Sequence, residues 1–512
     1  REQVTLALAY FYTLSIGCPM KSTISFFVRS KNAIMQNGIT NASHASFGLV
    51  EFKKMLIASS LGVLLPNAHA EDLKLASASS DSVVNAATQA TVPPPVPSTT
   101  DYDALFAKLQ PKGFNIGLPG PTDTVDPQAF GLRKALADMG IGYFGMNIIN
   151  TAGNTLANSA RETNGKQSYN GQKFTYYDTL YAGLTYDLSR YGIPDGQIYV
   201  AGMLNWVSWQ PMGPNKFGIS EASYYQTLLN KRFELKLGYL ANSWEFVNYS
   251  VGGSLASSVF GPSGSIPIQG GMSNNETPTP GANLTVNVTD KFYVKGGVQR
   301  SVNPDGLQAE IKYNQRGFKW NTPNAGTLSI GEVGYKQTPK DGTPYTWVRA
   351  GGAYNDSSSN SYSHPGTRTD HNSWYYLLGD RQIWQMQPGS SPGRGIYVGG
   401  SVMYAPPESN VVSQYYEARI YGKGLIKSRP YDLASLVLTD TVWSQYAVDN
   451  AADKGSMVHR DSKAATLSYS ARITNGVYAG IGLAYVNHPT TIAYQSDTGS
   501  ALNLLANLNV FF

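Results

Sequence analysis

Charged and aromatic side chains recur at alternate positions in several short segments of this chain. Glu234 precedes Lys236 by two residues, and Trp347 precedes Arg349 by the same interval. In a β-strand, residues two apart point to the same face, so each pair presents a cation beside a carboxylate or an aromatic ring. Such a face can replace the water hydrogen bonds of a hydroxyl-rich solute and stack against the apolar face of its ring.

No motif for covalent or metal chemistry accompanies these pairs. The sequence has no G-x-S-x-G, no H-E-x-x-H and no P-loop. His364 and His371 lie near Asp370 at a spacing that could bind a metal ion adventitiously, but surface histidines are the commoner case. Like His459 and His488, they fall in segments that we expect to be external loops. We therefore expect neither an enzyme nor a metal or other cofactor.

The elements that must position these side chains are segments with a period of two. The last eleven residues, 502–512, show it clearly, because asparagines separate the members of an apolar row. The row consists of Leu504, Ala506, Leu508, Val510 and Phe512. This period predicts a β-strand. We expect it to close a barrel by pairing with residues near 141–150, with the apolar row towards lipid.

Sixteen such segments are predicted from residue 141 onward, an even number as bacterial barrels require. They are 141–150, 175–188, 197–207, 221–229, 232–242, 283–289, 291–300, 327–336, 345–354, 373–385, 395–405, 411–425, 432–446, 463–474, 476–486 and 502–512. Their connections are mostly long and short in alternation, with 406–410 as an exception, and this is typical of a transmembrane barrel and not of a soluble sandwich. The predicted fold is therefore all-β, a transmembrane antiparallel β-barrel of about 16 strands with a short N-terminal helical segment. The longest connection, 243–282, is the predicted constriction loop.

The composition is compatible with this fold. Aromatic residues make up 12% of the chain, with 34 tyrosines, and charged residues only 14%, against about 25% in typical soluble domains. A sheet with lipid on one face and water on the other has such a composition, although a tyrosine-rich extracellular β protein does too. No apolar run approaches the roughly 18 residues of a spanning helix. Charges are nearly balanced after residue 70, so nothing indicates nucleic acid binding.

A secretory signal peptide is predicted at residues 50–70. It has a basic start at Lys53 and Lys54, a short apolar core, and a small-x-small cleavage pattern ending at Ala70. We interpret residues 1–49 as an over-extended gene call or non-native leader, with Val50 marking an alternative start. The sole cysteine lies in this leader, so no disulfide is expected after cleavage.

Residues 71–125 are predicted to be a disordered Ala/Ser/Pro-rich periplasmic tether that precedes a barrel domain at 126–512. A short helix can form at Tyr102–Leu109. A stronger helix is predicted at Pro127–Met139, with Asp126 as the N-cap and Gly140 as the stop. This helix is placed to plug or cap the mouth of the barrel.

Four segments resemble the carbohydrate-selective porin (OprB) family in their order and spacing. SEASYYQTLLNKRFELKLGYLANSWEF (220–246) resembles the family's acidic and aromatic strand, tight turn, second strand and following Glu-Phe. GLRKALADMGIGYFGMNIINTAGN (131–154) is similar to the opening helix and first strand, and YGKGLIKSRPYD (421–432) to a Gly-Leu-Ile, Arg-Pro turn. YVNHP (485–489) resembles the His-Pro after the penultimate strand. The resemblance covers 131–512 and implies a Gram-negative outer-membrane channel for facilitated diffusion of glucose and other small carbohydrates.

If the apolar row of each strand faces lipid, the opposite row lines the lumen. The predicted pore-lining and sugar-binding residues are Glu234, Lys236, Lys295, Trp347, Arg349, Glu417, Arg419, Lys423 and Arg472. Glu221, Trp244 and Glu245 flank the long loop and are predicted constriction residues, as is Arg381 on a strand of ambiguous alternation. Opposed charges around a pore orient dipolar solutes. For any one of these residues, simple solvation of a wide lumen is an equally good explanation.

Three functions are compatible with the sequence. The first is a sugar-selective diffusion porin, and the second is a general or anion-preferring porin on the same barrel. The third is a structural or export component of the outer membrane, in which residues 71–100 bind periplasmic partners. The expected partners are small carbohydrates and outer-membrane lipid, not nucleic acid. A monomer and a homotrimer are both compatible with the pattern.

Overall fold

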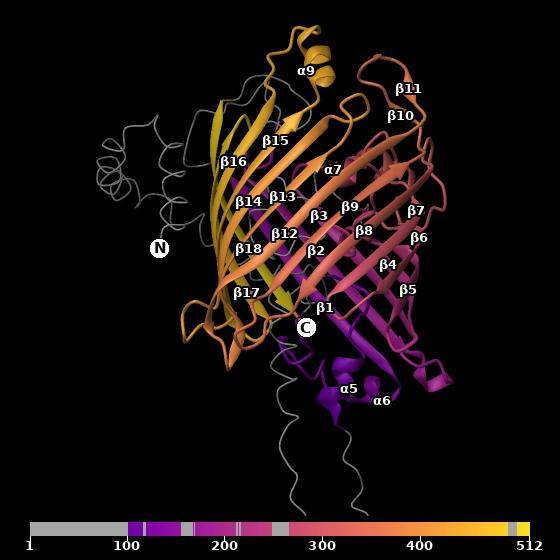
Figure 1. Ribbon diagram of the computed structural model, residues 1–512, viewed down its shortest axis with the longest axis vertical. Coiled ribbons are helices and arrows are strands. Elements are labelled where there is room, and N and C mark those ends of the chain that lie inside the picture. The colour runs from indigo at the N-terminus through magenta and orange to yellow at the C-terminus, as the bar shows by residue number, and fades with distance from the viewer. Residues whose placement is uncertain are drawn as a thin grey trace, which may run out of the picture. The chain divides into compact units, whose positions relative to one another are not determined.

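A computed structural model describes residues 101–115, 119–154, 167, 169–210, 213–214, 217–247, 266–489 and 499–512. Its sixteen long strands form one closed antiparallel barrel (Figure 1). In chain order they are β1 Ile141–Gly153, β2 Thr175–Asp187, β3 Gln197–Val207, β4 Phe217–Leu228, β5 Phe233–Leu240, β6 Thr279–Asn287, β7 Phe292–Arg300, β8 Thr327–Gln337, β9 Thr346–Asn355, β12 Asn372–Gln387, β13 Ser391–Tyr404, β14 Val412–Lys423, β15 Leu433–Trp443, β16 Asp461–Thr474, β17 Val477–Asn487 and β18 Ser500–Phe511. The predicted fold class and strand number are confirmed.

The connections differ between the two ends of the barrel. Long loops at one end carry the helices α8 Leu307–Tyr313 and α9 Gln445–Ala452 and the small hairpin of β10 Ser359–Asn360 and β11 Arg368–Thr369. The other end has tight turns, such as the one between β16 and β17. Figure 1 shows α9 and the hairpin at the top and the helices α5 Tyr102–Lys108 and α6 Arg133–Asp138 at the bottom. We call these the long-loop end and the short-turn end.

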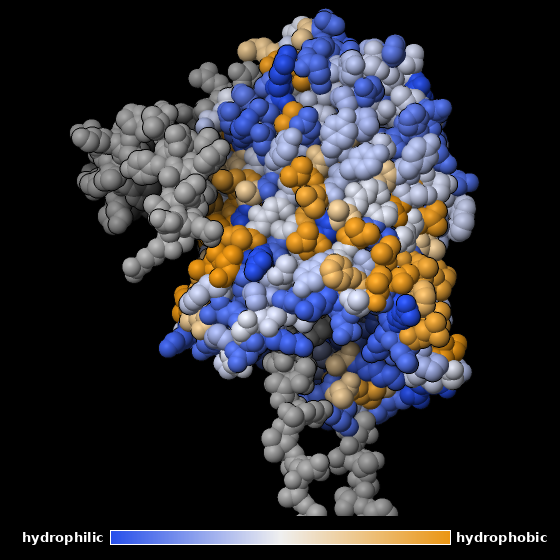
Figure 2. Space-filling model, in the orientation of Figure 1, coloured by the Kyte–Doolittle hydropathy of each residue, from blue (hydrophilic) through white to orange (hydrophobic). Residues whose placement is uncertain are grey.

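On the face that Figure 2 shows, apolar side chains, in orange, gather in a band across the middle of the barrel. Outward side chains of the strands, such as Val294, Val333 and Leu377, are exposed. Exposed tyrosines follow towards the long-loop end, at Tyr354, Tyr375, Tyr404, Tyr416 and Tyr485. Aromatic residues at the border of an apolar band are typical of a protein that sits in a lipid bilayer. Among the described residues, none of the helices has the length and apolar character needed to span a bilayer.

The barrel closes between β1 and β18, as the C-terminal pattern predicted. Met146 pairs with Phe511 and Gly153 with Leu504. Gly145 and Phe512 exchange both backbone hydrogen bonds, at 3.1 and 3.0 Å. The asparagines of β18 are buried on the lumen side while Leu504 is exposed outside. The last strand therefore seals the edge that a sheet of this kind would otherwise expose.

Removal of Phe511 and Phe512 is expected to reduce the amount of folded protein in the membrane, because the seam loses its hydrogen bonds to Gly145. Phe511 also packs edge-on against Tyr478, with ring centroids 5.7 Å apart. The measurement is the fraction of heat-modifiable folded barrel in isolated membranes. A control with leucine at both positions keeps the backbone seam. Normal insertion of the truncated chain would contradict this prediction.

The segment before the barrel differs from the prediction in two respects. The helix predicted at 127–139 forms only as α6, because the Asp126 carboxylate accepts hydrogen bonds from the backbone N–H groups of Gln128 and Phe130 and holds a turn. Ala129 and Phe130 have positive φ in this turn, so the helix cannot begin earlier. The possible helix at 102–109 is present as α5.

The described part of the predicted tether is structured. Tyr102–Lys108 form α5, and residues between 109 and 125 make hydrogen bonds to the barrel, so the predicted boundary at residue 125 is wrong. The proposed leader 1–49, the signal peptide 50–70 and residues 71–100 lie outside the described residues.

Candidate functional site in the barrel lumen

The connection between β5 and β6 folds into the barrel and not over it. Its first described part, 241–247, contains a short 3-10 helix (Asn242–Trp244), and its second part, 266–278, contains α7 Ile266–Gln269. Gln269 exchanges two hydrogen bonds with the backbone of Val412 on β14, at 2.5 and 3.0 Å. The connection leaves β5 and contacts β14, so it crosses the lumen. We call its described residues the inward loop.

Apolar packing holds the inward loop against one side of the lumen wall. Phe246, Ile266 and Met272 are fully buried in a cluster with residues of β8, β9, β12 and β14. Trp374 and Tyr376 of β12 belong to the same cluster. Several inward-facing strand positions contact the loop and not water, and this explains why their residues are apolar.

Two carboxylates enclose one lysine where the inward loop begins. The Lys236 ammonium lies 2.6 Å from a Glu221 oxygen and 3.2 Å from a Glu245 oxygen. The three side chains are at most 3% exposed. Lys295 donates to the Glu245 backbone carbonyl at 3.2 Å, and Asn283 donates to the Glu245 carboxylate at 2.9 Å. We call Glu221, Lys236 and Glu245 the lysine cluster.

The strands explain why these side chains meet. Lys236 faces the lumen on β5 and pairs with Tyr225 of β4. A bulge in the pairing of β3 with β4 falls next to Glu221, and a bulge re-aims the side chains beside it. Glu245 follows the 3-10 helix of the inward loop. Two wall strands and one loop thus supply one charge each.

A second group of charges surrounds Arg419 on β14. Its guanidinium bonds to both carboxylate oxygens of Asp380, at 2.8 and 2.6 Å, and to Glu417 at 2.6 Å. Tyr415 and Tyr421 donate to the same carboxylates. The arginine side chain is fully buried among them. The guanidinium is therefore held in one orientation on the lumen wall.

A third group combines an aromatic face with a cation. The Arg349 guanidinium carbon lies 3.6 Å from the centre of the Trp347 ring. Tyr293 accepts a hydrogen bond from the Trp347 indole at 3.1 Å and donates to Glu332 at 2.7 Å. Tyr376 donates to the other Glu332 oxygen at 2.7 Å. Arg349 Nε and Nη1 are buried without a hydrogen-bond partner among the described residues.

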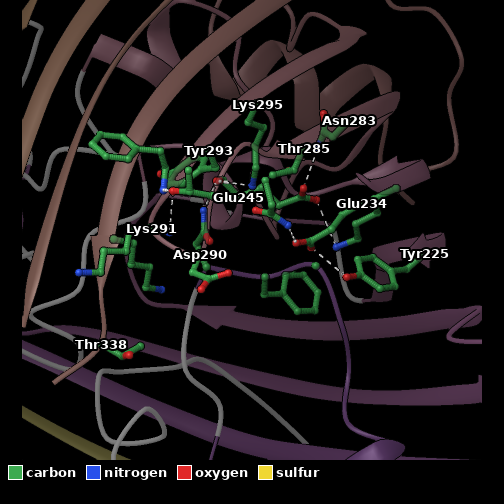
Figure 3. Close-up of a pocket in the computed structure, with 18 residues that line it drawn as sticks. Tyr225, Glu234, Glu245, Asn283, Thr285, Asp290, Lys291, Tyr293, Lys295 and Thr338 are labelled. Atoms are coloured by element: carbon green, nitrogen blue, oxygen red, sulfur yellow. Dashed lines mark hydrogen bonds and ion pairs between the residues drawn. The ribbon is translucent and has the colours of Figure 1, made fainter. Parts of the chain in front are cut away.

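A cavity of about 270 Å³ lies on the lumen side of β4–β8 at the short-turn end (Figure 3). At roughly 30 Å³ per water molecule it has room for one small solute. The lining includes carboxylates, amides, ammonium groups and aromatic rings. Glu234 belongs to it and accepts hydrogen bonds from Tyr225 at 2.9 Å and Asn287 at 2.8 Å. Lys236, Glu245 and Lys295 also line it, so the cavity adjoins the lysine cluster.

The structure places most of the predicted site residues on the lumen side. Lys236, Glu221 and Glu245 come together, as do Glu417 with Arg419 and Trp347 with Arg349. Trp244 is buried against Phe114 from the segment before the barrel. Lys423 lies at the short-turn end, with its ammonium 5.0 Å from the Tyr397 ring. Their roles in transport stay predictions.

Two predicted residues differ from the others. Arg472 lies in the inward row of β16 with the buried Ser468 and Ser470, but it forms an ion pair with Asp123, at 2.6 Å, and so ties the N-terminal segment to the wall before the turn after β16. Arg381 is exposed between the buried Asp380 and Gln382, so it lies on the outer face and its assignment to the constriction is wrong. A bulge between Gln382 and Trp384 disturbs the alternation of β12, which explains why the sequence pattern was ambiguous there.

Glu332 and Asp380 were missed by the sequence analysis. Both share a row with apolar residues, Leu328 and Ile330 in one strand and Trp374 and Leu378 in the other. Such a row resembles a lipid-facing one when only the sequence is considered. The only indication of a lumen position in the sequence was a single acidic residue in the alternate row of each strand. Among the described residues, no group of three or more His, Cys, Asp or Glu side chains is arranged to hold a metal ion.

A family model described as carbohydrate-selective porin, OprB family, matches residues 134–502. This chain belongs to the OprB family. The match includes all three charged groups of the lumen and most of the barrel wall. The resemblance stated from the sequence is thereby confirmed. A search of curated proteins finds no match.

Solved structures of other porins are similar to this OprB-family barrel. The high-pH structure of Pseudomonas putida OprB has a TM-score of 0.63 at 16% identity, and the match covers 76% of this chain and 99% of that one. The low-pH structure of the same protein has a TM-score of 0.48 at 13% identity, with the same coverage. OmpT of Vibrio cholerae has a TM-score of 0.41 at 11% identity, covering 73% and 99% of the chains. The likeness to the first shows a common fold.

Proposed function

We propose that this chain is a channel of the bacterial outer membrane through which glucose and other small neutral carbohydrates diffuse. Membership of the OprB family and the closed barrel support the location and the mode of transport. The chemistry of the lumen supports the solute class. The inward loop narrows the path, so that a solute contacts the wall and not only water.

The observation that carries the proposal is the pair of Arg349 and Trp347. The guanidinium lies over the ring, and two of its buried nitrogens have no hydrogen-bond partner among the described residues. A buried donor without a partner costs about 1–3 kcal/mol. A solute rich in hydroxyl oxygens relieves this cost when a side-chain movement exposes these nitrogens to it. A sugar is such a solute.

The pairing of charges favours a neutral solute over an anion. Two carboxylates surround each cation, Glu221 and Glu245 around Lys236 and Asp380 and Glu417 around Arg419. Each group therefore has a formal charge of −1, and its opposite charges at short distance give a strong local field. Such a field orients a dipolar molecule, and the excess of carboxylates does not attract anions. This argues against the anion-preferring alternative.

Liposome swelling tests the proposal against a general or anion-preferring porin. Purified protein is reconstituted into liposomes, which are diluted into isotonic glucose, gluconate or glucosamine. These solutes have similar size and differ in charge. We expect glucose to enter fastest. Equal rates for all three would indicate a general porin, and faster entry of gluconate an anion-preferring one.

A further inference from the structure

The segment that precedes β1 enters the barrel at the short-turn end. Thr185 donates to the Leu109 carbonyl at 2.5 Å, and Gln197 donates to the Gln110 carbonyl at 3.0 Å. Gln197 also accepts from the Lys112 N–H group at 3.0 Å. These bonds fix the segment to β2 and β3. We call the described residues 109–115 and 119–125 the N-terminal strap.

The strap reaches the lysine cluster through a glycine. Gly113 has a φ of +82°, and a Cβ there would lie 3.0 Å from the side chains of Lys236 and Tyr225. Only glycine accepts this backbone and this approach without strain. The next residue, Phe114, then lies with its ring centre 3.7 Å from the Lys236 ammonium. The ring also packs edge-on against Trp244, 5.3 Å between centroids.

Backbone hydrogen bonds join the strap to the inward loop. The Asn115 N–H group donates to the Trp244 carbonyl at 3.0 Å, and its side-chain amide donates to the Glu245 carbonyl at 2.6 Å. The lysine cluster is therefore enclosed by two segments that do not belong to the barrel wall. The inward loop comes from the long-loop end, and the strap comes from the short-turn end.

The strap leaves the lumen at a different part of the wall. Asp123 accepts hydrogen bonds from Arg472, from the Gly476 N–H group and from the Tyr478 hydroxyl. The Val125 N–H group donates to the Phe511 carbonyl at 2.8 Å. Strands β1–β4 and β18 separate β5 from β17 around the barrel. The strap therefore crosses the opening, and the cavity of Figure 3 lies between its tip and β4–β8.

We propose that the N-terminal strap is part of the channel, and that Phe114 and Asn115 set the width and the chemistry of its passage at the short-turn end. The geometry supports this, because Phe114 shares the lining of the cavity with the lysine cluster. Phe114 adds an aromatic surface from outside the barrel wall to those of Tyr225 and Tyr293. The family match begins at residue 134, so the strap is a feature of this chain outside the matched region.

Cysteine modification tests the proposal through ionic current. Phe114→Cys is made in a Cys18→Ser background, and single-channel current is recorded before and after a positively charged methanethiosulfonate is added at the short-turn side. We expect the current to fall by roughly half or more, because the added group occupies the passage. Phe130→Cys is the matched control, since Phe130 precedes the barrel too and is 84% exposed. Its modification is expected to leave the current unchanged.

Two results would overturn the proposal. One is failure of the thiol introduced by Phe114→Cys to react in the folded protein, and the other is complete modification without a change in current.

If Phe114→Cys does not fold, Asn115→Ala gives a second test, since it removes the hydrogen bond to Glu245 and keeps the ring. A higher conductance is expected from it, and an unchanged conductance contradicts the proposal. The inference rests on the proposed channel function, but its test uses no sugar, so a failed sugar assay and a failed modification assay are separate results.

Discussion

Replacement of Lys236 by methionine is expected to destabilise the folded protein by about 3–5 kcal/mol, because it leaves two buried carboxylates without their shared cation. Glu221 and Glu245 both contact the same ammonium, at 2.6 and 3.2 Å, and have almost no access to water. Methionine has a similar length but no charge. We expect Glu245 to move into water together with the start of the inward loop, because water then solvates its unpaired carboxylate.

This prediction has two measurable consequences. The urea midpoint for unfolding from lipid vesicles, followed by tryptophan fluorescence, is expected to decrease. The single-channel conductance is expected to increase, because the displaced loop no longer narrows the lumen. Lys454→Met is the control, since Lys454 is exposed in the loop after α9. Identical midpoints and conductances for the two variants would show that the lysine cluster does not hold the inward loop.

Replacement of Arg349 by alanine is expected to weaken the block of ionic current by glucose roughly tenfold or more. A hydrogen bond to a charged donor contributes about 1.5–3 kcal/mol, and about 1.4 kcal/mol corresponds to tenfold in a binding constant. The variant removes the two buried guanidinium nitrogens that have no partner among the described residues. It also frees the face of Trp347 that the guanidinium covers.

The matched control for this variant is Arg381→Ala. The same chemical change is made on the outer face of the barrel, where Arg381 is exposed. We expect the control to bind glucose as the unmodified protein does. The half-blocking concentration of glucose is measured for both variants in planar bilayers. Equal values for Arg349→Ala and Arg381→Ala would remove Arg349 from the sugar path.

The strands were predictable because the side chains of each strand alternate between the outer face and the lumen, which gives the sequence a period of two. The predicted edges of β3 agree with the structure at both ends, and those of β1 and β2 at one end. The alternation follows from burial against lipid on one face, which is a local property. The seam was predictable for the same reason, since β18 has an unbroken apolar row that must face outward.

The lumen was less predictable because its surface is not uniformly polar. Leu328 and Ile330 face inward, where the inward loop covers them. A rule that assigns every apolar row to lipid therefore overlooks Glu332 at the end of that row. Asp380 was missed in the same way on β12. These errors depend on a contact between segments distant in sequence, which no local pattern contains.

The strap was missed for a different reason. The residues before it are rich in alanine, serine and proline, and this composition predicts a disordered segment. The structure of residues 101–115 and 119–125 depends on Phe114, Asn115 and Asp123, whose partners lie in the folded barrel. The local feature of the sequence that agrees with this structure is Gly113, since a glycine accepts the positive φ and the close approach to Lys236.

The central claim is that this barrel selects small neutral sugars, and the most direct test is the current through single channels in a planar bilayer as glucose is added. The account predicts that the current decreases with glucose concentration and reaches saturation, because the sugar occupies a site among fixed side chains. Gluconate at the same concentrations is expected to block less. A current that is independent of glucose up to the highest soluble concentrations would contradict the claim.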